Sequence, residues 1–523
     1  MTSHYSILND ALGPIFVGPS SSHTAAPARI GKTGRQLLGE PVRKAVITLD
    51  ENGSYPTTYR GHGSDYGFVG GLLGRMPDTP GLQYSLVDAE KAGMDVTFKI
   101  ADIGGTHPNA ALLELEGRPE GCTLALLTHS TGGGMFEIVS MDGFTVSIKG
   151  DVKKIFILCA GEAEAALREL LESLNENQFR VSTVREGGSA LFEIAQLAEL
   201  DEGLLSKIST SPGVIWVRSA DVLLPVASRF EYELPFATAS EALLYSGARA
   251  IPMWRLALLY ETSVGLIDEE GVIARVLHII ETMRSAAKAG LGGESRRKGY
   301  LEPKAAEMAE KAKTVKLIDV GVMNKVMLWA TAVMEYNSTP GVIVAGPTGG
   351  SSGVLPGAVI AVGEEMGLPD LEITKAMLAA GLVGVFIANQ ATFGAEVAGC
   401  QAENGSGSAM AAAGIVELLG GSAEDGFKAA SLAMQNLLGL VCDPIACLAE
   451  IPCVNRNTVA AYNAVASAHM VLCGFDPVIP LDETIMAMLS VGRMLPRELR
   501  CTGLGGLCLT DTAKRIEAEL SVK

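Results

Sequence analysis

The segment "KKIFILCAGEAEAALRELLESLNENQFRVSTVREGGSALFEIAQ", residues 153–196, decides how this chain is divided. It opens with an apolar run typical of a strand, and the following stretch of Ala, Leu and Glu predicts a helix. Two further β-rich runs flank a Gly-Gly dipeptide, which predicts a hairpin. "DEGLLSKISTS" (201–211) then predicts a helix and "GVIWVRSAD" (213–221) a last strand. The order βαββαβ is typical of a ferredoxin-like unit.

The sequence pattern changes on either side of this unit. Before it, runs such as "RKAVITLDENG" (43–53) predict strands that end in turns, and "AAPARIGKTGRQLLG" (25–39) predicts a helix closed by glycine. After it, apolar residues recur at three- and four-residue spacing, which predicts close-packed helices. A chain of 523 residues is too long for one compact core. We therefore expect an α+β fold with three domains: an α/β domain (1–150), a βαββαβ module (151–228) and a mostly α-helical domain (229–523).

Charge and cysteine content narrow the functional classes. The formal net charge of −18 repels nucleic acids and anionic membranes, so neither is expected as a partner. Nine cysteines occur without an N-terminal export signal, which favours a reducing compartment, the cytoplasm. The uncharged stretch Ala376–Ala395 is long enough to span a bilayer, but it carries Asn389, Gln390 and several glycines. We expect it to form a buried core helix.

The stretch "VCDPIACLAEIPCVNRN" (441–457) is unusually rich in cysteine. Cys442 and Cys453 lie in loop-like contexts, as does Cys400, whereas Cys447 lies in an apolar helical turn where a buried, inert thiol is expected. Three loop thiolates suit an iron–sulfur cluster and would leave one iron open for Lewis-acid chemistry. A structural zinc site would need four ligands and usually a CxxC pair. On spacing alone, buried structural thiols remain the alternative.

Serine- and glycine-rich segments supply the candidate binding residues. "GPSSSHT" (18–24) precedes a helix, so its hydroxyls and free amides could bind a carboxylate, although an ordinary serine cap is the alternative. "THSTGGGMFEI" (128–138) and "GPTGGSSG" (346–353) are glycine turns that bring backbone N–H groups near a ligand. The candidate substrate-binding residues are Ser20, Ser21, Ser22, His23, Thr24, Ser130, Gly132, Gly133, Thr348 and Gly349.

His62 is the candidate catalytic residue. It lies between two glycines in "RGHGSDYGF" (60–68), where an imidazole can exchange a proton near neutral pH. An ordinary surface-loop histidine fits the local sequence equally well. His107, in "GTHPNA", is a lesser candidate of the same kind.

Together these motifs resemble the iron–sulfur-dependent L-serine dehydratases, or L-serine ammonia-lyases, in their single-chain form. "GPSSSHT", "HGSD", "HPN" and "STGGG" are similar to motifs of that family's β domain. "GPTGGSSGVLPG", "GCQAENGSGSAMAAAG", "CDP…PCVNRN" and "TGLGGL" are similar to motifs of its α domain. The 151–228 module resembles the ACT domain, a unit that binds amino acids or pairs subunits, although a plain dimerisation or spacer module fits as well.

The resemblance implies a fold, a cofactor and a reaction. The chain would consist of a serine dehydratase β domain, an ACT-like domain and an α-helical iron–sulfur catalytic domain. Cys400, Cys442 and Cys453 would hold a [4Fe-4S] cluster, and His62 would remove the α-proton of L-serine. The products would be pyruvate and ammonia. The expected partners are a small amino-acid substrate and a second copy of the chain in a homodimer.

Several positions depart from the family pattern. Arg296 and Arg297 enter a loop that usually carries small residues, Asn404 replaces a small apolar residue, and Cys501 and Cys508 replace an acidic residue and an alanine. These changes bear on the substrate more than on the cofactor. The alternatives are a related dehydratase or lyase for another β-substituted amino or hydroxy acid, and a non-catalytic iron–sulfur sensor read through the ACT-like module.

Overall fold

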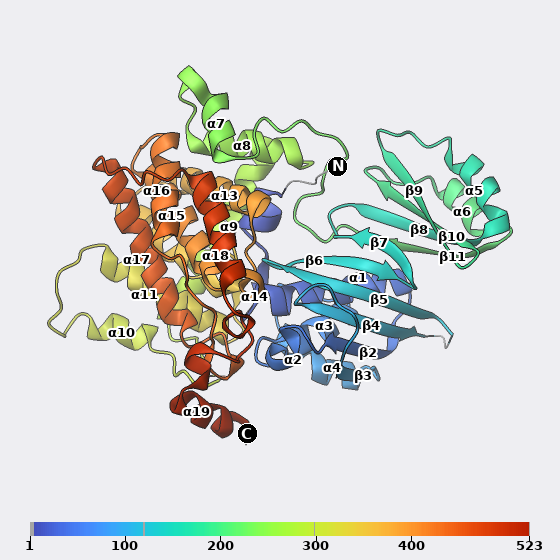
Figure 1. Ribbon diagram of the computed structural model, residues 1–523, viewed down its shortest axis with the longest axis horizontal. Helices are drawn as coiled ribbons and strands as arrows, with labels where there is room; N and C mark the ends of the chain where they lie inside the picture. The colour runs from blue at the N-terminus through green and yellow to red at the C-terminus, as the bar shows by residue number, and fades with distance from the viewer. Residues whose placement is uncertain (1–4, 119–120, 298, 522–523) are drawn as a thin grey trace.

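The computed structural model describes residues 5–118, 121–297 and 299–521. A β-rich N-terminal part and a helical C-terminal part lie side by side, with a small second sheet at the outer end (Figure 1). The predicted mixed α+β architecture is confirmed in this form.

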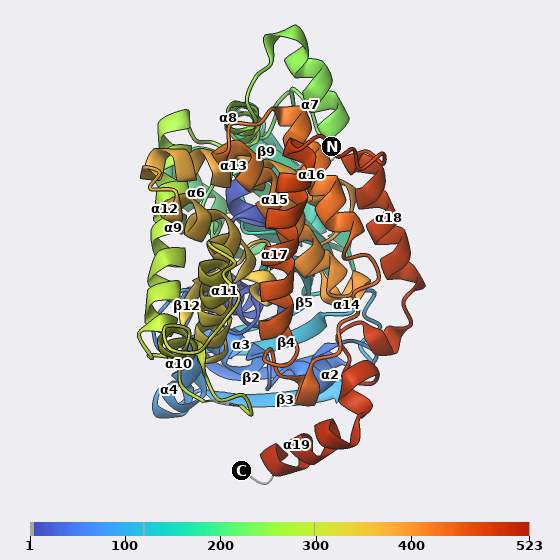
Figure 2. The same ribbon diagram turned by 90° about the vertical axis from the view of Figure 1, so that its left-hand side faces the viewer.

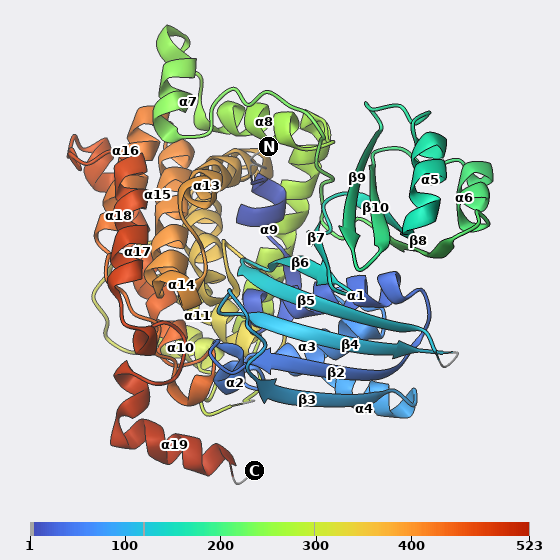
Figure 3. The ribbon, with the colours of Figure 1, turned by 45° about the vertical axis from the view of Figure 1, so that its right-hand side comes forward.

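The larger sheet has six strands and is covered by helices (Figure 3). Its two neighbouring strands β2 and β3 are parallel, and the other pairs are antiparallel. In order across the sheet, the strands are β3 (Asp95–Ala101), β2 (Val42–Asp50), β4 (Ala110–Gly117), β5 (Thr123–Gly132), β6 (Met135–Met141) and β7 (Phe144–Ile148).

Two of the covering helices, α1 (Ala26–Leu38) and α3 (Ser64–Leu72), touch backbone to backbone. A β-carbon added at Gly31 would lie 2.2 Å from the carbonyl of Phe68, and one at Gly71 would lie 2.1 Å from that of Ala28. Only glycine allows this approach. The contact fixes the start of α1, which directly follows the serine-rich segment, beside the start of α3, which directly follows the loop of His62.

The smaller sheet has the βαββαβ order predicted for residues 153–221. Its four antiparallel strands are arranged β11-β8-β10-β9, with α5 (Glu164–Leu171) and α6 (Glu202–Ser209) as the two helices. The predicted Gly-Gly turn joins β9 and β10, and both glycines have positive φ, as a two-residue hairpin requires. The strands are β8 (Lys153–Ala160), β9 (Phe179–Glu186), β10 (Ser189–Gln196) and β11 (Val214–Ala220).

The helical part is built around α13 (Asp370–Gln390), which packs against α15, α8 and α9. This helix is long and apolar enough to cross a membrane, but most of it is buried inside the protein. The prediction of a buried core helix at this position is confirmed. Figure 2 shows the surrounding helices, which include α8 (Met253–Val264), α9 (Glu269–Leu291), α11 (Met323–Ser338), α15 (Ser406–Leu418), α16 (Ala423–Gln435), α17 (Cys453–Leu472) and α18 (Leu481–Met494).

The first residues that the structure describes, from Tyr5 on, join the two parts. Strand β1 (Ile15–Val17) pairs antiparallel with β12 (Val342–Val344) of the helical part. The buried carboxylate of Glu261 accepts hydrogen bonds from the backbone of Ile7 at 2.6 Å and from the hydroxyl of Ser6 at 2.6 Å. The serine-rich segment follows directly and therefore lies at the junction between the two parts.

Candidate active site

Two segments far apart in the sequence bring cysteines together at this junction: the one after the short helix α14 (Ala395–Ala398) and the one between α16 and α17. The thiols of Cys400 and Cys442 and a carboxylate oxygen of Glu403 all lie within 4.8 Å of one another. Cys400 follows α14, and Cys453 is the first residue of α17. The structure thus gathers two of the three cysteines that the sequence singled out as cluster ligands and adds a carboxylate that it missed. The third, Cys453, lies near enough for the charge of Cys400 to act on it.

Backbone hydrogen bonds hold the loops that carry Cys400 and Cys442 against each other and against the segment around Leu499. The amide of Gln401 donates to the carbonyl of Leu440 at 3.0 Å, and that of Cys442 donates to the carbonyl of Leu499 at 2.9 Å. Gly399 has a φ of 77°, and a β-carbon there would lie 2.8 Å from the Leu440 carbonyl. The loop before Cys400 therefore needs glycine for its conformation and for its close approach.

The thiols are buried and therefore hard to ionise. Contact with Cys442 and burial raise the pKa of Cys400 well above its ordinary value. Contact with Cys400 lowers the pKa of Cys442, but contact with Cys501 and burial outweigh it. Burial, followed by the charge of Cys400, raises the pKa of Cys453. Thiols of this kind ionise when a soft metal binds them, so the donor set fits an iron–sulfur cluster.

A partly buried cation accompanies the thiols. Arg456, on α17, places a guanidinium nitrogen 3.8 Å from the sulfur of Cys400 and forms an ion pair with Asp443 at 2.9 Å. Thiolates around a metal carry negative charge, and this guanidinium offsets part of it. Cys447 is only partly buried, unlike the buried thiol expected there, and it lies outside the buried group formed by Cys400 and Cys442.

Two buried histidines face this region from the N-terminal part. The rings of His23 and His62 meet edge to face with centroids 5.0 Å apart. His62 is 5% exposed, and neither ring nitrogen has a hydrogen-bond partner in the described part of the chain. Burial lowers the pKa of His62 to about 4 and also lowers that of His23, so both rings are neutral near pH 7. A surface-loop histidine, the alternative interpretation of His62, is excluded.

The segment around His62 contacts the cysteine loops directly. The hydroxyl of Ser54 donates to the carbonyl of Cys501 at 3.0 Å and lies 3.4 Å from a ring nitrogen of His23. Thr57 donates to the carbonyl of Thr502 at 3.0 Å. A β-carbon on Gly61 would lie 2.4 Å from the carbonyl of Cys447. The histidines and the cysteines therefore form a single site across the two parts of the protein.

The serine-rich segment forms a short π-helix, Ser21–Ala25, and most of its hydroxyls hold this site together. Ser20 accepts from the amide of His23 at 3.1 Å, and the Thr24 hydroxyl donates to the carbonyl of His62 at 2.6 Å. The hydroxyl of Ser22 lies 2.9 Å from the Nδ1 atom of His23.

The glycine loops are divided between this site and another cavity. The Gly349 amide donates to the Ser21 hydroxyl at 3.1 Å, and the Thr348 hydroxyl donates to Glu403 at 2.7 Å. Ser130 also belongs to the site, because its hydroxyl donates to the carbonyl of Ser22 at 2.7 Å.

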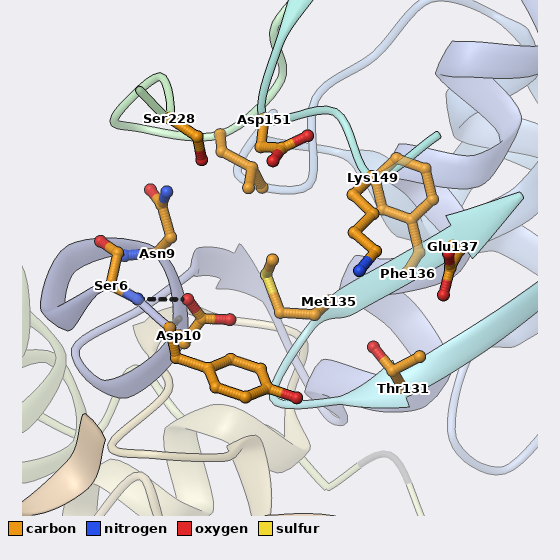
Figure 4. A pocket seen from close by; sticks show the side chains of 12 residues that line it. Ser6, Asn9, Asp10, Thr131, Met135, Phe136, Glu137, Lys149, Asp151 and Ser228 are labelled. Carbon is orange, nitrogen blue, oxygen red and sulfur yellow. Dashed lines mark hydrogen bonds between the residues drawn. The ribbon is translucent and has the colours of Figure 1, made fainter. Parts of the chain in front are cut away.

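Gly132 and Gly133, by contrast, pack against Phe393 and Gly394. Gly132 borders a separate cavity. This cavity lies next to the one drawn in Figure 4, and Asp10, Thr131 and Met135 line both.

Several polar residues of the site carry no obvious sequence signal. The amide of Asn109 donates to buried Glu396 at 2.8 Å, and burial raises the pKa of Glu396 to about 7. Burial also raises the pKa of Glu403. The two glutamates within the otherwise apolar run "AEVAGCQAEN" are the signal that could have identified Glu396 and Glu403. Glutamate is almost never fully buried unless it is paired, so glutamates in an apolar run call for a partner.

A cavity of about 270 Å³ lies beside the site. Ser54 and Glu396 line it, together with Arg497, Arg500 and His107, the lesser histidine candidate. The lining holds two guanidinium groups, of Arg497 and Arg500, and two carboxyl groups, of Asp50 and Glu396, so a substrate carboxylate can pair with an arginine there. Arg296 and Arg297 are exposed and donate to backbone carbonyls of their own loop, so this pair is solvated.

Comparison with known proteins identifies two matching families. Residues 11–101 match the serine dehydratase beta chain, and residues 163–508 match the serine dehydratase alpha chain. L-serine dehydratase of Mycobacterium bovis is 33% identical over 96% of this chain and 98% of its own length. L-serine dehydratase of Streptomyces coelicolor is 30% identical over 95% and 97%. The probable L-serine dehydratase alpha chain of Bacillus subtilis is 35% identical over 54% of this chain and 95% of its own length.

Proposed function

Because this chain belongs to the serine dehydratase family, we propose that it converts L-serine to pyruvate and ammonia at the junction of its two parts. The observation that carries this proposal is the meeting of buried cysteines with two neutral histidines across that junction. The full-length relatives are named L-serine dehydratases, which supports the same reaction and substrate.

The cofactor we propose is a [4Fe-4S] cluster held by Cys400, Cys442 and Cys453. When bound, such a cluster supplies an iron with an open position, which acts as a Lewis acid toward the hydroxyl that leaves. Hydroxide is a poor leaving group, so this assistance is needed. Arg456 stabilises the negative charge of the thiolates from within the protein.

His62 takes the α-proton of the substrate at a ring nitrogen. Both nitrogens are free of hydrogen bonds within the described residues, and the ring is neutral near pH 7. A pKa of about 4 makes it a weak base, so the α-proton must be made more acidic by the polarised substrate. His23, in contact with Ser22 and Ser54, orients the neighbouring ring by edge-to-face packing.

Substrate binding is divided between the two parts. The serine-rich segment, with Ser20, Ser21, Ser22, His23 and Thr24, forms one wall, and Thr348 and Gly349 form the other. Ser130 supports the first wall from β5, whereas Gly132 and Gly133, which we expected to bind substrate, lie beside the separate cavity. The cavity lined by Arg497 and Arg500 is the route by which the substrate carboxylate reaches this site.

The 151–228 module is proposed to be ACT-like and to pair two chains in a homodimer. Its edge strand β9 has one unpaired side within the described chain and exposes Val181 and Val184. An edge of this kind is a template for pairing with a second copy. We place the enzyme in the cytoplasm, where thiols stay reduced. The molar mass of the purified protein in solution tests the dimer, and a monomer would contradict it.

Pyruvate release tests the proposed reaction. Protein purified without air is given L-serine, and D-serine and L-threonine serve as comparisons; the 2-oxo acid released is identified, because L-threonine would give 2-oxobutanoate and not pyruvate. We expect pyruvate and ammonia in equal amounts from L-serine. A 2-oxo acid from none of these substrates, in protein with full iron content, would favour the alternative of a sensor or a dehydratase for another acid.

A further inference from the structure

A fourth cysteine, Cys501, lies against the proposed cluster ligands. It is 6% exposed and packs in one buried group with Cys400 and Cys442. Its thiol contacts that of Cys442, which in turn contacts that of Cys400. Two other cysteines of the same region, Cys447 and Cys508, are not part of this buried group.

The backbone holds Cys501 in place from both parts of the protein. Its amide donates to the carbonyl of Cys442 at 3.0 Å, which completes a short parallel bridge between Cys442 and Arg500. Its carbonyl accepts the hydroxyl of Ser54 at 3.0 Å. Its φ is 59°, a left-handed conformation that is unfavourable for a residue with a side chain. Strain of this kind collects at functional sites.

The neighbours of Cys501 locate it relative to the substrate route. Thr502 and Arg500, on either side of it, line the 270 Å³ cavity together with Ser54 and Glu396. Ser54 also lies beside His23. The backbone of Cys501 therefore lies between the cysteine group and the segment that carries Ser54, whereas Arg456 approaches the group at Cys400.

We propose that Cys501 is a fourth protein ligand of the cluster in the substrate-free enzyme, at the iron that Cys400, Cys442 and Cys453 leave open. Four cysteine thiolates are the usual ligand set of a four-iron cluster. This inference rests on the cluster of the proposed function.

The exchange with substrate involves no redox change. In the resting enzyme the thiol loses its proton to water and its sulfur bonds to the iron. When L-serine binds, the iron–sulfur bond to Cys501 breaks, the substrate occupies the position, and the thiolate takes up a proton. The bound iron is thus protected from loss and from oxidants until the substrate arrives.

Mössbauer spectroscopy of protein purified without air and loaded with ⁵⁷Fe tests this ligand. In the wild type without substrate, we expect four irons that all show tetrahedral sulfur coordination. In Cys501→Ala, one iron in four should shift to a signal typical of an oxygen or nitrogen ligand. In the wild type, addition of L-serine should produce the same change.

Cys508→Ala is the matched control, because Cys508 is buried in the same segment but lies outside the buried group of Cys400, Cys442 and Cys501. It should give the wild-type spectrum. Brief exposure to ferricyanide should convert Cys501→Ala to a paramagnetic three-iron cluster sooner than the wild type.

The result that overturns the inference is one distinct iron in four in the substrate-free wild type, or a spectrum of Cys501→Ala identical to that of the wild type. The wild-type spectrum decides the question even if the variant does not fold. Protein that binds no iron at all would instead refute the cofactor of the proposed function and leave no cluster for Cys501 to ligate.

Discussion

Replacing His62 with asparagine removes the proposed base and keeps a polar side chain of similar shape. A positioned general base contributes about 10²–10⁴-fold to a reaction, so the turnover of L-serine should fall by that factor, which corresponds to about 3–5 kcal/mol. The cluster absorbance should persist, because the structure places the cysteines on other loops. Turnover and iron content are measured on the same preparation, and exchange of the α-deuteron of labelled serine isolates the proton-transfer step.

The pH dependence of kcat/KM is a second, independent test of His62 as the base. Burial lowers the pKa of His62 from 6.5 to about 4, which disfavours the protonated ring by about 3 kcal/mol. The base is active only when neutral, so kcat/KM of the wild type should decline as the pH falls through about 4 and should show no decline near 6.5. Protein stability at the lowest pH must be followed in parallel by circular dichroism.

His278→Asn is the matched control, because the His278 side chain is 69% exposed on α9. It should leave turnover and the pH profile unchanged. Near-wild-type turnover in His62→Asn would refute the assignment and make His23 the next residue to test. Loss of the cluster in His62→Asn would show that the histidine has a structural role.

The remaining predictions concern the cluster, its charge and the buried acids. The iron–sulfur absorbance should be abolished by Cys400→Ala, Cys442→Ala or Cys453→Ala and kept in Cys447→Ala. Absorbance that is lost in Cys447→Ala but kept in Cys453→Ala would refute the ligand assignment. Arg456→Gln removes the positive charge beside Cys400 and should lower the iron retained during gel filtration severalfold. Unchanged iron retention would show that this charge is not needed to hold the cluster. Burial raises the pKa of Asp10 from 3.8 to about 7, so its contribution to stability falls as the pH rises from about 4 to 7. Asp10→Asn should therefore raise Tm relative to the wild type at pH 8 and leave it unchanged at pH 4, and an equal difference at both would contradict this.

Much of the fold could be predicted because the signals are local. The Gly-Gly turn, the βαββαβ order and the apolar run of α13 each lie within one short stretch of sequence. Loop cysteines next to glycine and proline are local signals of the same kind, and they pointed to Cys400, Cys442 and Cys453, of which Cys453 is the first residue of α17.

The rest of the site depends on contacts between distant segments. Ser54 and Cys501 are separated by 447 positions, and Asn109 and Glu396 by 287, so neither pair carries a pattern within one segment. The burial of His62 arises because α3 packs on α1 and because Gly61 approaches the Cys447 loop. The glycines of "STGGG" have the turn conformation that their sequence indicates, but Gly132 borders the cavity next to the one in Figure 4.

The measurement that tests the account most directly is the rate of pyruvate formation as a function of cluster content. Iron and sulfide are restored without air to different extents in one preparation of the iron-free protein, and the rate with L-serine is determined for each sample. We expect the rate to rise in proportion to the four-iron cluster per chain and to be zero in the iron-free protein. Pyruvate formation by iron-free protein, or a rate independent of cluster content, would contradict the account.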